Sequence, residues 1–163
     1  MTAYDASDWT DLFVATAGAS AALAGLVFVA VSINVERILK FEGLPERALQ
    51  TVLLLLSVVI VSIICLIPQG RIALGLELLA VGLAFAVQVT RLSQGERPPG
   101  VKRGQWLLNR VFIQALGTVP FVIGGISLIA ESGGGLYWTA AGIVFAISGA
   151  VANAWVLLVE ILR

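Results

Sequence analysis

LFVATAGASAALAGLVFVAVSI occupies residues 12–33 and contains no charged side chain. A helix of about 20 apolar residues spans the hydrocarbon core of a bilayer, and it satisfies its own backbone polar groups there. The run is too long for the apolar part of a secretory signal. Asp5, Asp8 and Asp11 also precede it, where a signal would carry positive charge. The stretch is therefore predicted to be a retained transmembrane helix.

Four further apolar stretches have the length of a membrane span. The sequence thus predicts an all-α, polytopic membrane bundle, a single integral membrane domain over residues 1–163 with five transmembrane helices at about 12–33, 48–67, 72–90, 111–130 and 136–159. The composition agrees, because 59% of the residues are apolar and 12% are charged, against roughly 45–50% and about 25% in soluble domains. The lipid bilayer is the first expected partner.

The positive charges indicate how the helices are oriented. Of the ten Lys and Arg residues, all but Arg71 fall on one side of the predicted membrane. The positive-inside rule then places the N-terminus outside and the C-terminus in the cytoplasm. The cytoplasmic loop 91–110 is the longest connection. It is interpreted as a solvated linker or as a contact for anionic lipids or a protein partner.

Several classes of function are excluded by residue types. Ten Lys and Arg balance ten Asp and Glu, so no basic surface for nucleic acid is expected. The chain has no His, and Cys65 is its single cysteine, which removes the commonest metal ligands and an intramolecular disulfide. No phosphate-binding, hydrolase or metalloprotease motif is present. We expect no enzyme activity, no catalytic residues, no metal site and no cofactor.

Small residues mark helix contacts in membranes because they let two backbones approach closely. The first span is rich in them and is predicted to lie at the centre of the bundle. The second span, with Leu53–Leu56 and Val58–Val61, is predicted to face lipid. The predicted packing or oligomer faces are Gly18, Ala22 and Gly25 in the first span and Gly142, Ala146 and Gly149 in the fifth. We expect a homo-oligomer, in which the small and polar seam of the fifth span either lines a pore or forms a dry contact.

Glu77 is the clearest ionisable group predicted to lie in the membrane. It lies six residues past Arg71, about 9 Å below the outer boundary at 1.5 Å per residue. Ionisable groups at such depth are costly and mark functional sites. One interpretation is a carboxylate that coordinates an ion or carries a proton. The other is a neutral acid bonded to a neighbouring carbonyl or to a hydroxyl such as that of Thr16, Ser20, Ser62 or Ser127.

A second polar group is predicted near the cytoplasmic side. It would form a hydrated vestibule on an ion or proton pathway, or simply hydrogen bonds between helices. Its members are Ser32, Asn34, Gln88, Gln114 and Asn153.

The first half of the chain resembles a known family. The similarity is carried by Trp9 to Phe13, by residues 18–34 (GASAALAGLVFVAVSIN), and by LPERA at 44–48, PQG at 68–70 and GLELLA at 75–80. These segments resemble a family of small bacterial, actinobacterial-type multi-pass membrane proteins of unknown function, sometimes labelled modulators of FtsH protease. The resemblance implies a bacterial plasma membrane and places Glu77 within a family motif, but it implies no established activity.

Two functions are therefore expected as alternatives. The first is a homo-oligomeric channel or pathway for ions or protons that uses Glu77. The second is a non-conducting accessory or regulatory subunit that binds another membrane protein, for instance a membrane protease.

Overall fold

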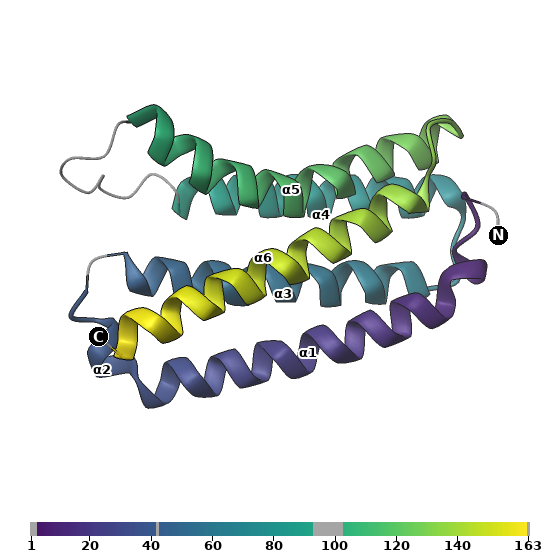
Figure 1. Cartoon of the computed structure of the whole chain (residues 1–163). Helices are drawn as coiled ribbons and strands as arrows, with labels where there is room; N and C mark the ends of the chain where they lie inside the picture. The colour runs from purple at the N-terminus through teal and green to yellow at the C-terminus, as the bar shows by residue number, and fades with distance from the viewer. Residues whose placement is uncertain (1–2, 42, 93–102, 163) are drawn as a thin grey trace.

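The structure is a computed structural model that describes residues 3–41, 43–92 and 103–162. In these ranges a 3-10 turn, η1 (Ala6–Trp9), is followed by helices only. These are α1 (Thr10–Ile33), α2 (Val35–Ile38), α3 (Leu44–Leu66), α4 (Arg71–Leu92), α5 (Arg103–Ala130) and α6 (Leu136–Leu162) (Figure 1). The predicted all-α class is confirmed for the described residues.

Four stretches of the described chain are long and apolar enough to cross a membrane, which indicates a membrane protein. They are Ala6–Ile33, Leu44–Leu66, Arg71–Gln88 and Leu136–Val159. The side chains of residues 103–114 in α5 lie outside the described part of the chain, and the described apolar stretch of this helix, Ala115–Ala130, is shorter than these four.

Turn residues set the ends of the helices. Gly43 has a φ of 83° and precedes α3, with Pro45 in the first turn of that helix. Pro68 follows α3, where it cannot continue the helical hydrogen bonds. The connection from α5 to α6 contains three glycines with positive φ, Gly133, Gly134 and Gly135. These short connections place consecutive helices side by side and antiparallel (Figure 1).

Helices α3 and α6 form the middle of the bundle of five long helices (Figure 1). Figure 1 shows α4 and α5 together on one side, α3 and α6 in the middle, and α1 on the other side. In agreement, α3 contacts α1, α6 and α4, whereas the main neighbour of α1 is α3. The N-terminus and the C-terminus lie at opposite ends of the bundle (Figure 1).

The order of burial differs from the prediction for the first two spans. Half of the α3 span is buried inside the bundle, compared with 11% of the α1 span. Leu54, Leu55, Val58 and Val61 of α3 are all at most 2% exposed. The predictions that the first span is central and that the second faces lipid are therefore wrong. The physical reason is that a bundle centre must be filled to high density, and large branched side chains supply the volume that Ala and Gly lack.

Helices α4 and α5 approach each other closely at their glycines. A Cβ added to Gly125 would be 2.7 Å from the backbone oxygen of Gly75, and one added to Gly75 would be 2.9 Å from that of Gly125. A Cβ at Gly82 would be 2.9 Å from the Val122 side chain. Glycine therefore acts as the small residue of a helix contact here, on two helices for which the sequence analysis predicted no such contact.

Candidate functional site

Glu77 lies on the outward surface of α4 and is exposed in the single chain. The side-chain amide of Gln69 donates a hydrogen bond of 2.7 Å to its Oε2 atom. The same amide nitrogen donates to the carbonyl oxygen of Ile64 at 3.2 Å. The connection between α3 and α4 therefore holds the carboxylate in place from its residue Gln69.

The partner of Glu77 differs from the hydroxyls predicted for it. Thr16 and Ser62 bond to each other across α1 and α3, with 3.0 Å between their oxygens. The Ser127 hydroxyl bonds to the backbone of the α5–α6 connection. Among the described residues, Glu77 is bonded to the Gln69 amide and not to one of these hydroxyls, because it lies on the exposed face of α4 close to the α3–α4 connection.

Small side chains surround Glu77 on the exposed face of α4. Ala73, Ala80 and Ala84 lie four residues before, three after and seven after it, and all three are exposed. These spacings place them on the same helical face as Glu77. The opposite face of α4, with Leu74 and Leu78, is buried. The carboxylate thus lies in a shallow, small-residue surface that another helix could approach closely.

Of the other predicted pathway residues whose side chains are described, Ser32 and Asn34 lie apart from Gln88. The hydroxyl of Ser32 donates to the carbonyl of Phe28 at 2.8 Å, and the amide of Asn34 donates to that of Ala30 at 2.9 Å. Both bonds stay within the N-terminal helix. Gln88 is exposed on α4, which lies on the other side of the α3 and α6 layer from α1 (Figure 1).

The last two pathway candidates lie on α5 and α6. Asn153 is half-buried on α6. Gln114 belongs to α5, but its side chain lies outside the described residues.

The two predicted packing faces have different surroundings. Gly142, Ala146 and Gly149 of α6 are buried within the bundle, and a Cβ at Gly142 would be 2.8 Å from the Phe121 ring. Gly18, Ala22 and Gly25 of α1 are exposed, and a Cβ at Gly18 or Gly25 would have no atom within 4 Å. Of the two faces, the one on α1 is thus open to a second molecule.

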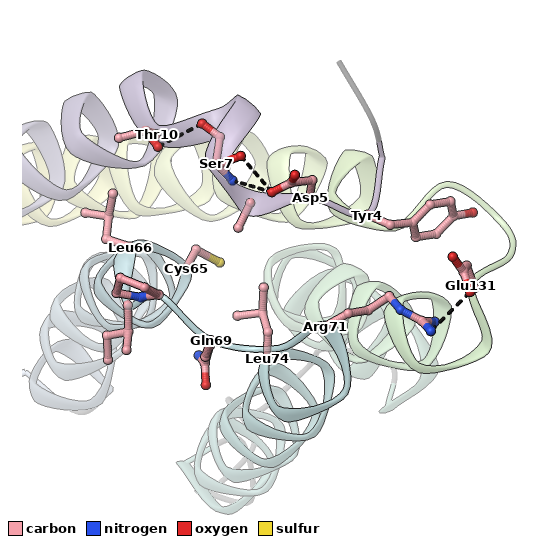
Figure 2. Close-up of a pocket in the computed structure, with 13 residues that line it drawn as sticks. Tyr4, Asp5, Ser7, Thr10, Cys65, Leu66, Gln69, Arg71, Leu74 and Glu131 are labelled. Carbon is pink, nitrogen blue, oxygen red and sulfur yellow. Dashed lines mark hydrogen bonds and ion pairs between the residues drawn. The ribbon is translucent and has the colours of Figure 1, made fainter.

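A hollow of about 730 Å³ with a mixed polar and apolar lining lies at the end of the bundle that holds the N-terminal segment (Figure 2). Three segments that are distant in the sequence form it: the N-terminal segment, the connection from α3 to α4, and the connection after α5. Its lining residues are Tyr4, Asp5, Ala6, Ser7, Thr10, Cys65, Leu66, Ile67, Pro68, Gln69, Arg71, Leu74 and Glu131.

Arg71 joins two of these segments. Its Nη1 atom donates to the carbonyl oxygens of Leu128 and Ile129 at 3.2 and 3.4 Å. Its Nη2 atom lies 3.1 Å from a carboxylate oxygen of Glu131 (Figure 2). The cation therefore interacts with the carbonyl end of α5, where a positive charge is favoured.

Asp5 forms the acidic part of the N-terminal segment. Its Oδ1 atom accepts hydrogen bonds from the Ser7 backbone N–H at 3.0 Å and from the Ser7 hydroxyl at 2.7 Å (Figure 2). These two bonds lower the pKa of Asp5 from its ordinary value, because they stabilise the ionised form.

Backbone contacts hold the N-terminal segment across the α5–α6 connection. The N–H of Leu136 donates to the carbonyl of Ala3 at 2.7 Å, and the rings of Trp9 and Tyr137 meet edge to face with centroids 4.8 Å apart. The hollow could not be predicted from the sequence, because its walls come together only in the folded chain. The one sequence feature that pointed to it was Arg71, the single Lys or Arg predicted on the outer side of the membrane.

The described residues contain no group of three or more Asp, Glu or Cys side chains placed to hold a metal. No family model, curated protein or solved structure matches this chain.

Proposed function

We propose that this protein is a homo-oligomeric, multi-pass protein of a bacterial plasma membrane, in which Glu77 contributes to an ion or proton pathway between subunits. The observation that carries the proposal is the exposed carboxylate of Glu77 on the outward face of α4, within the candidate span Arg71–Gln88.

Lipid is an unfavourable neighbour for this carboxylate. A charged side chain costs roughly 2.5–3.5 kcal/mol at the centre of a membrane on insertion scales. The Gln69 amide bonds to one of its oxygens, but hydrocarbon offers no donor to the other. A neighbouring subunit or a hydrated path at this face would remove the cost, and the small residues Ala73, Ala80 and Ala84 would let a second helix come close.

The interior of the subunit supports a path between subunits rather than through one. Leu54, Val58, Phe121 and Ile143 come from four positions along α3, α5 and α6, and each is at most 2% exposed. Such close-packed apolar side chains make the middle of the subunit an unfavourable path for water or an ion. An ion or proton would therefore pass along the outer face of α4.

The five-span arrangement and its orientation are part of the proposal. With α5 as the fifth span, the chain crosses the membrane an odd number of times, in agreement with termini at opposite ends of the bundle (Figure 1). The excess of Lys and Arg on one side would place the N-terminus outside.

A second candidate function is a non-conducting accessory subunit that binds another membrane protein. The observation that favours it is the open face of α1, where Gly18 and Gly25 have free space around them and Ala22 is exposed. A helix of a different protein could pack there as readily as a second copy.

Native mass spectrometry from lipid nanodiscs, at several protein-to-lipid ratios, tests the assembly. A fixed closed oligomer of three or more subunits supports a path between subunits. A monomer at every ratio contradicts the pathway and directs attention to a protein partner.

Cysteine cross-linking then identifies which face of the subunit forms the interface between subunits. In a Cys65→Ala background, Ala80→Cys is expected to form a disulfide between subunits if the Glu77 face is the interface. Ala22→Cys reports on the α1 face in the same way. Val144→Cys, on a 60% exposed side chain of α6, is the matched control.

Proton and cation flux into proteoliposomes tests the role of Glu77. Glu77→Gln keeps the shape of the side chain and an acceptor for the Gln69 amide, but it cannot carry a proton or a charge. We expect it to lower the flux at least tenfold, while Glu36→Gln, an exposed change on α2, leaves it unchanged. Equal flux through wild type and Glu77→Gln would refute the pathway. A silent wild type that co-purifies with one fixed partner would support the accessory subunit.

A further inference from the structure

We propose that the hollow of about 730 Å³ between the N-terminal segment, the α3–α4 connection and Glu131 binds the headgroup of a phospholipid that carries a primary ammonium. The proposal concerns the end of the bundle and does not require that Glu77 carries ions or protons, although Gln69, which bonds to Glu77, is one of the lining residues.

The hollow lies at the ends of three candidate membrane spans. Three of the candidate spans begin or end at Ala6, Leu66 and Arg71, and all three residues line the hollow. Its volume falls within the roughly 300–1,000 Å³ that is usual for small-molecule sites. A ligand in it would therefore have its polar part at the membrane surface.

The charged groups of the hollow match a zwitterion. The Arg71 guanidinium has more N–H donors than the oxygens of Leu128, Ile129 and Glu131 that hold it here. It can therefore also donate to a phosphate. Asp5 and Glu131, the latter paired with Arg71, supply two carboxylates to the lining (Figure 2), and a carboxylate accepts hydrogen bonds from an ammonium group.

An apolar strip leads away from the hollow along α3. Cys65, Leu66 and Leu74 are among the apolar residues of the lining. Ile67, another lining residue, is 50% exposed, and Ile63, one helical turn before it, is 51% exposed. This strip offers a surface for acyl chains directly below the headgroup, so the occupant we assign is a lipid rather than a soluble phosphate compound.

The same groups discriminate between lipid classes. The trimethylammonium of phosphatidylcholine has no N–H to donate to Asp5 or Glu131. Phosphatidylglycerol has no ammonium at all, and its phosphate would meet two carboxylates and one guanidinium, a net charge of −1 in the lining. Phosphatidylethanolamine is therefore the expected ligand among the three.

Native mass spectrometry of the protein from nanodiscs that contain equal amounts of these three lipids measures the preference. We expect phosphatidylethanolamine to be retained at least fivefold over each of the others. Equal retention of the three lipids would overturn the proposal. Soluble glycerophosphoethanolamine, added in excess, should not displace the lipid, and displacement by it would overturn the assignment of a lipid as the occupant.

Substitutions of the lining residues test whether the lipid preference arises at the hollow. Asp5→Asn with Glu131→Gln changes the charge of the lining from −1 to +1, so the preference should shift from phosphatidylethanolamine to phosphatidylglycerol. Asparagine also caps helices well, and Glu131 is 62% exposed, so the fold should persist.

Glu131→Gln alone should produce an intermediate shift, and Glu36→Gln, at the far end of the bundle, should produce none. An unchanged order of lipids in the double variant would refute the site.

Discussion

Replacement of Gly125 by alanine tests the contact between α4 and α5. The added Cβ would lie 2.7 Å from the Gly75 carbonyl oxygen and 2.9 Å from the Leu79 amide nitrogen. Both neighbours are backbone atoms, so no side-chain rotation can relieve the overlap. Ordinary van der Waals contact begins at 3.4 Å, and the two helices would have to separate by about 0.7 Å at this point.

The cost follows from the forced separation. Overpacking of a close-packed interior typically costs about 1–3 kcal/mol, and a clash between backbones belongs at the upper end of that range. Alanine also gains roughly 0.5–1 kcal/mol over glycine within a helix. We therefore expect Gly125→Ala to lower the free energy of unfolding by about 1–2 kcal/mol.

Gly18→Ala is the matched control because a Cβ there has no atom within 4 Å. It carries the same gain in helix propensity without the clash, so it should be neutral or stabilising. The difference between the two variants isolates the steric cost. Equilibrium unfolding in mixed micelles, followed through the fluorescence of the four tryptophans, measures both at a dilution where the protein is monomeric.

Two results would refute the reasoning. One is a Gly125→Ala protein as stable as wild type, which would mean that α4 and α5 do not approach so closely. The other is an equal loss from Gly18→Ala in the monomer, which would mean that α1 is packed on its glycine face. A loss from Gly18→Ala that appears only at high protein concentration would instead support self-association through α1.

Three further outcomes are expected. A double-mutant cycle of Thr16→Ala and Ser62→Ala should give a coupling energy of about 0.6 kcal/mol, the average for hydrogen bonds between membrane helices, and zero coupling would exclude the bond between α1 and α3. Gly135→Ala should lower the thermal unfolding midpoint, because a side chain is strained at a φ of 49° and its Cβ would overlap the carbonyl oxygen of the N-terminal segment. The pKa of Asp5 should lie below its ordinary value of 3.8 because Ser7 bonds to the ionised form, so the cap stabilises the fold fully above the unfolded-state pKa and loses this effect as the pH falls through the folded one. In an NMR titration, Ser7→Ala should raise the midpoint of Asp5, and an unchanged midpoint would contradict this.

The helices themselves could be predicted from the sequence because the signal is local. Leu12–Ile33 and Leu136–Val159 are long, apolar and nearly free of charge, and hydrocarbon allows such a segment little other than a helix. Pro68 and the glycines at 133–135 mark connections for equally local reasons. These features depend on each segment alone, and the structure has helices and turns at these places.

The neighbours of each helix could not be predicted in the same way. The small residues Gly18 and Gly25 of α1 and the glycines Gly75 and Gly125 of α4 and α5 look alike in the sequence, yet only the second pair makes a close contact. A glycine permits close approach without selecting the helix that approaches. The candidate site shows the same limit, since Glu77 was identified from its depth but its Gln69 partner was not.

The sequence by itself therefore determined an all-helical chain with apolar segments long enough for a membrane, because length, hydropathy and backbone hydrogen bonding act within one segment. Only the tertiary structure decided that α3 is the central helix, that the Glu77 face of α4 points outward, and that Asp5, Arg71 and Glu131 meet around one hollow. These features depend on how the volumes of several helices fill a common space, and no single segment contains that information.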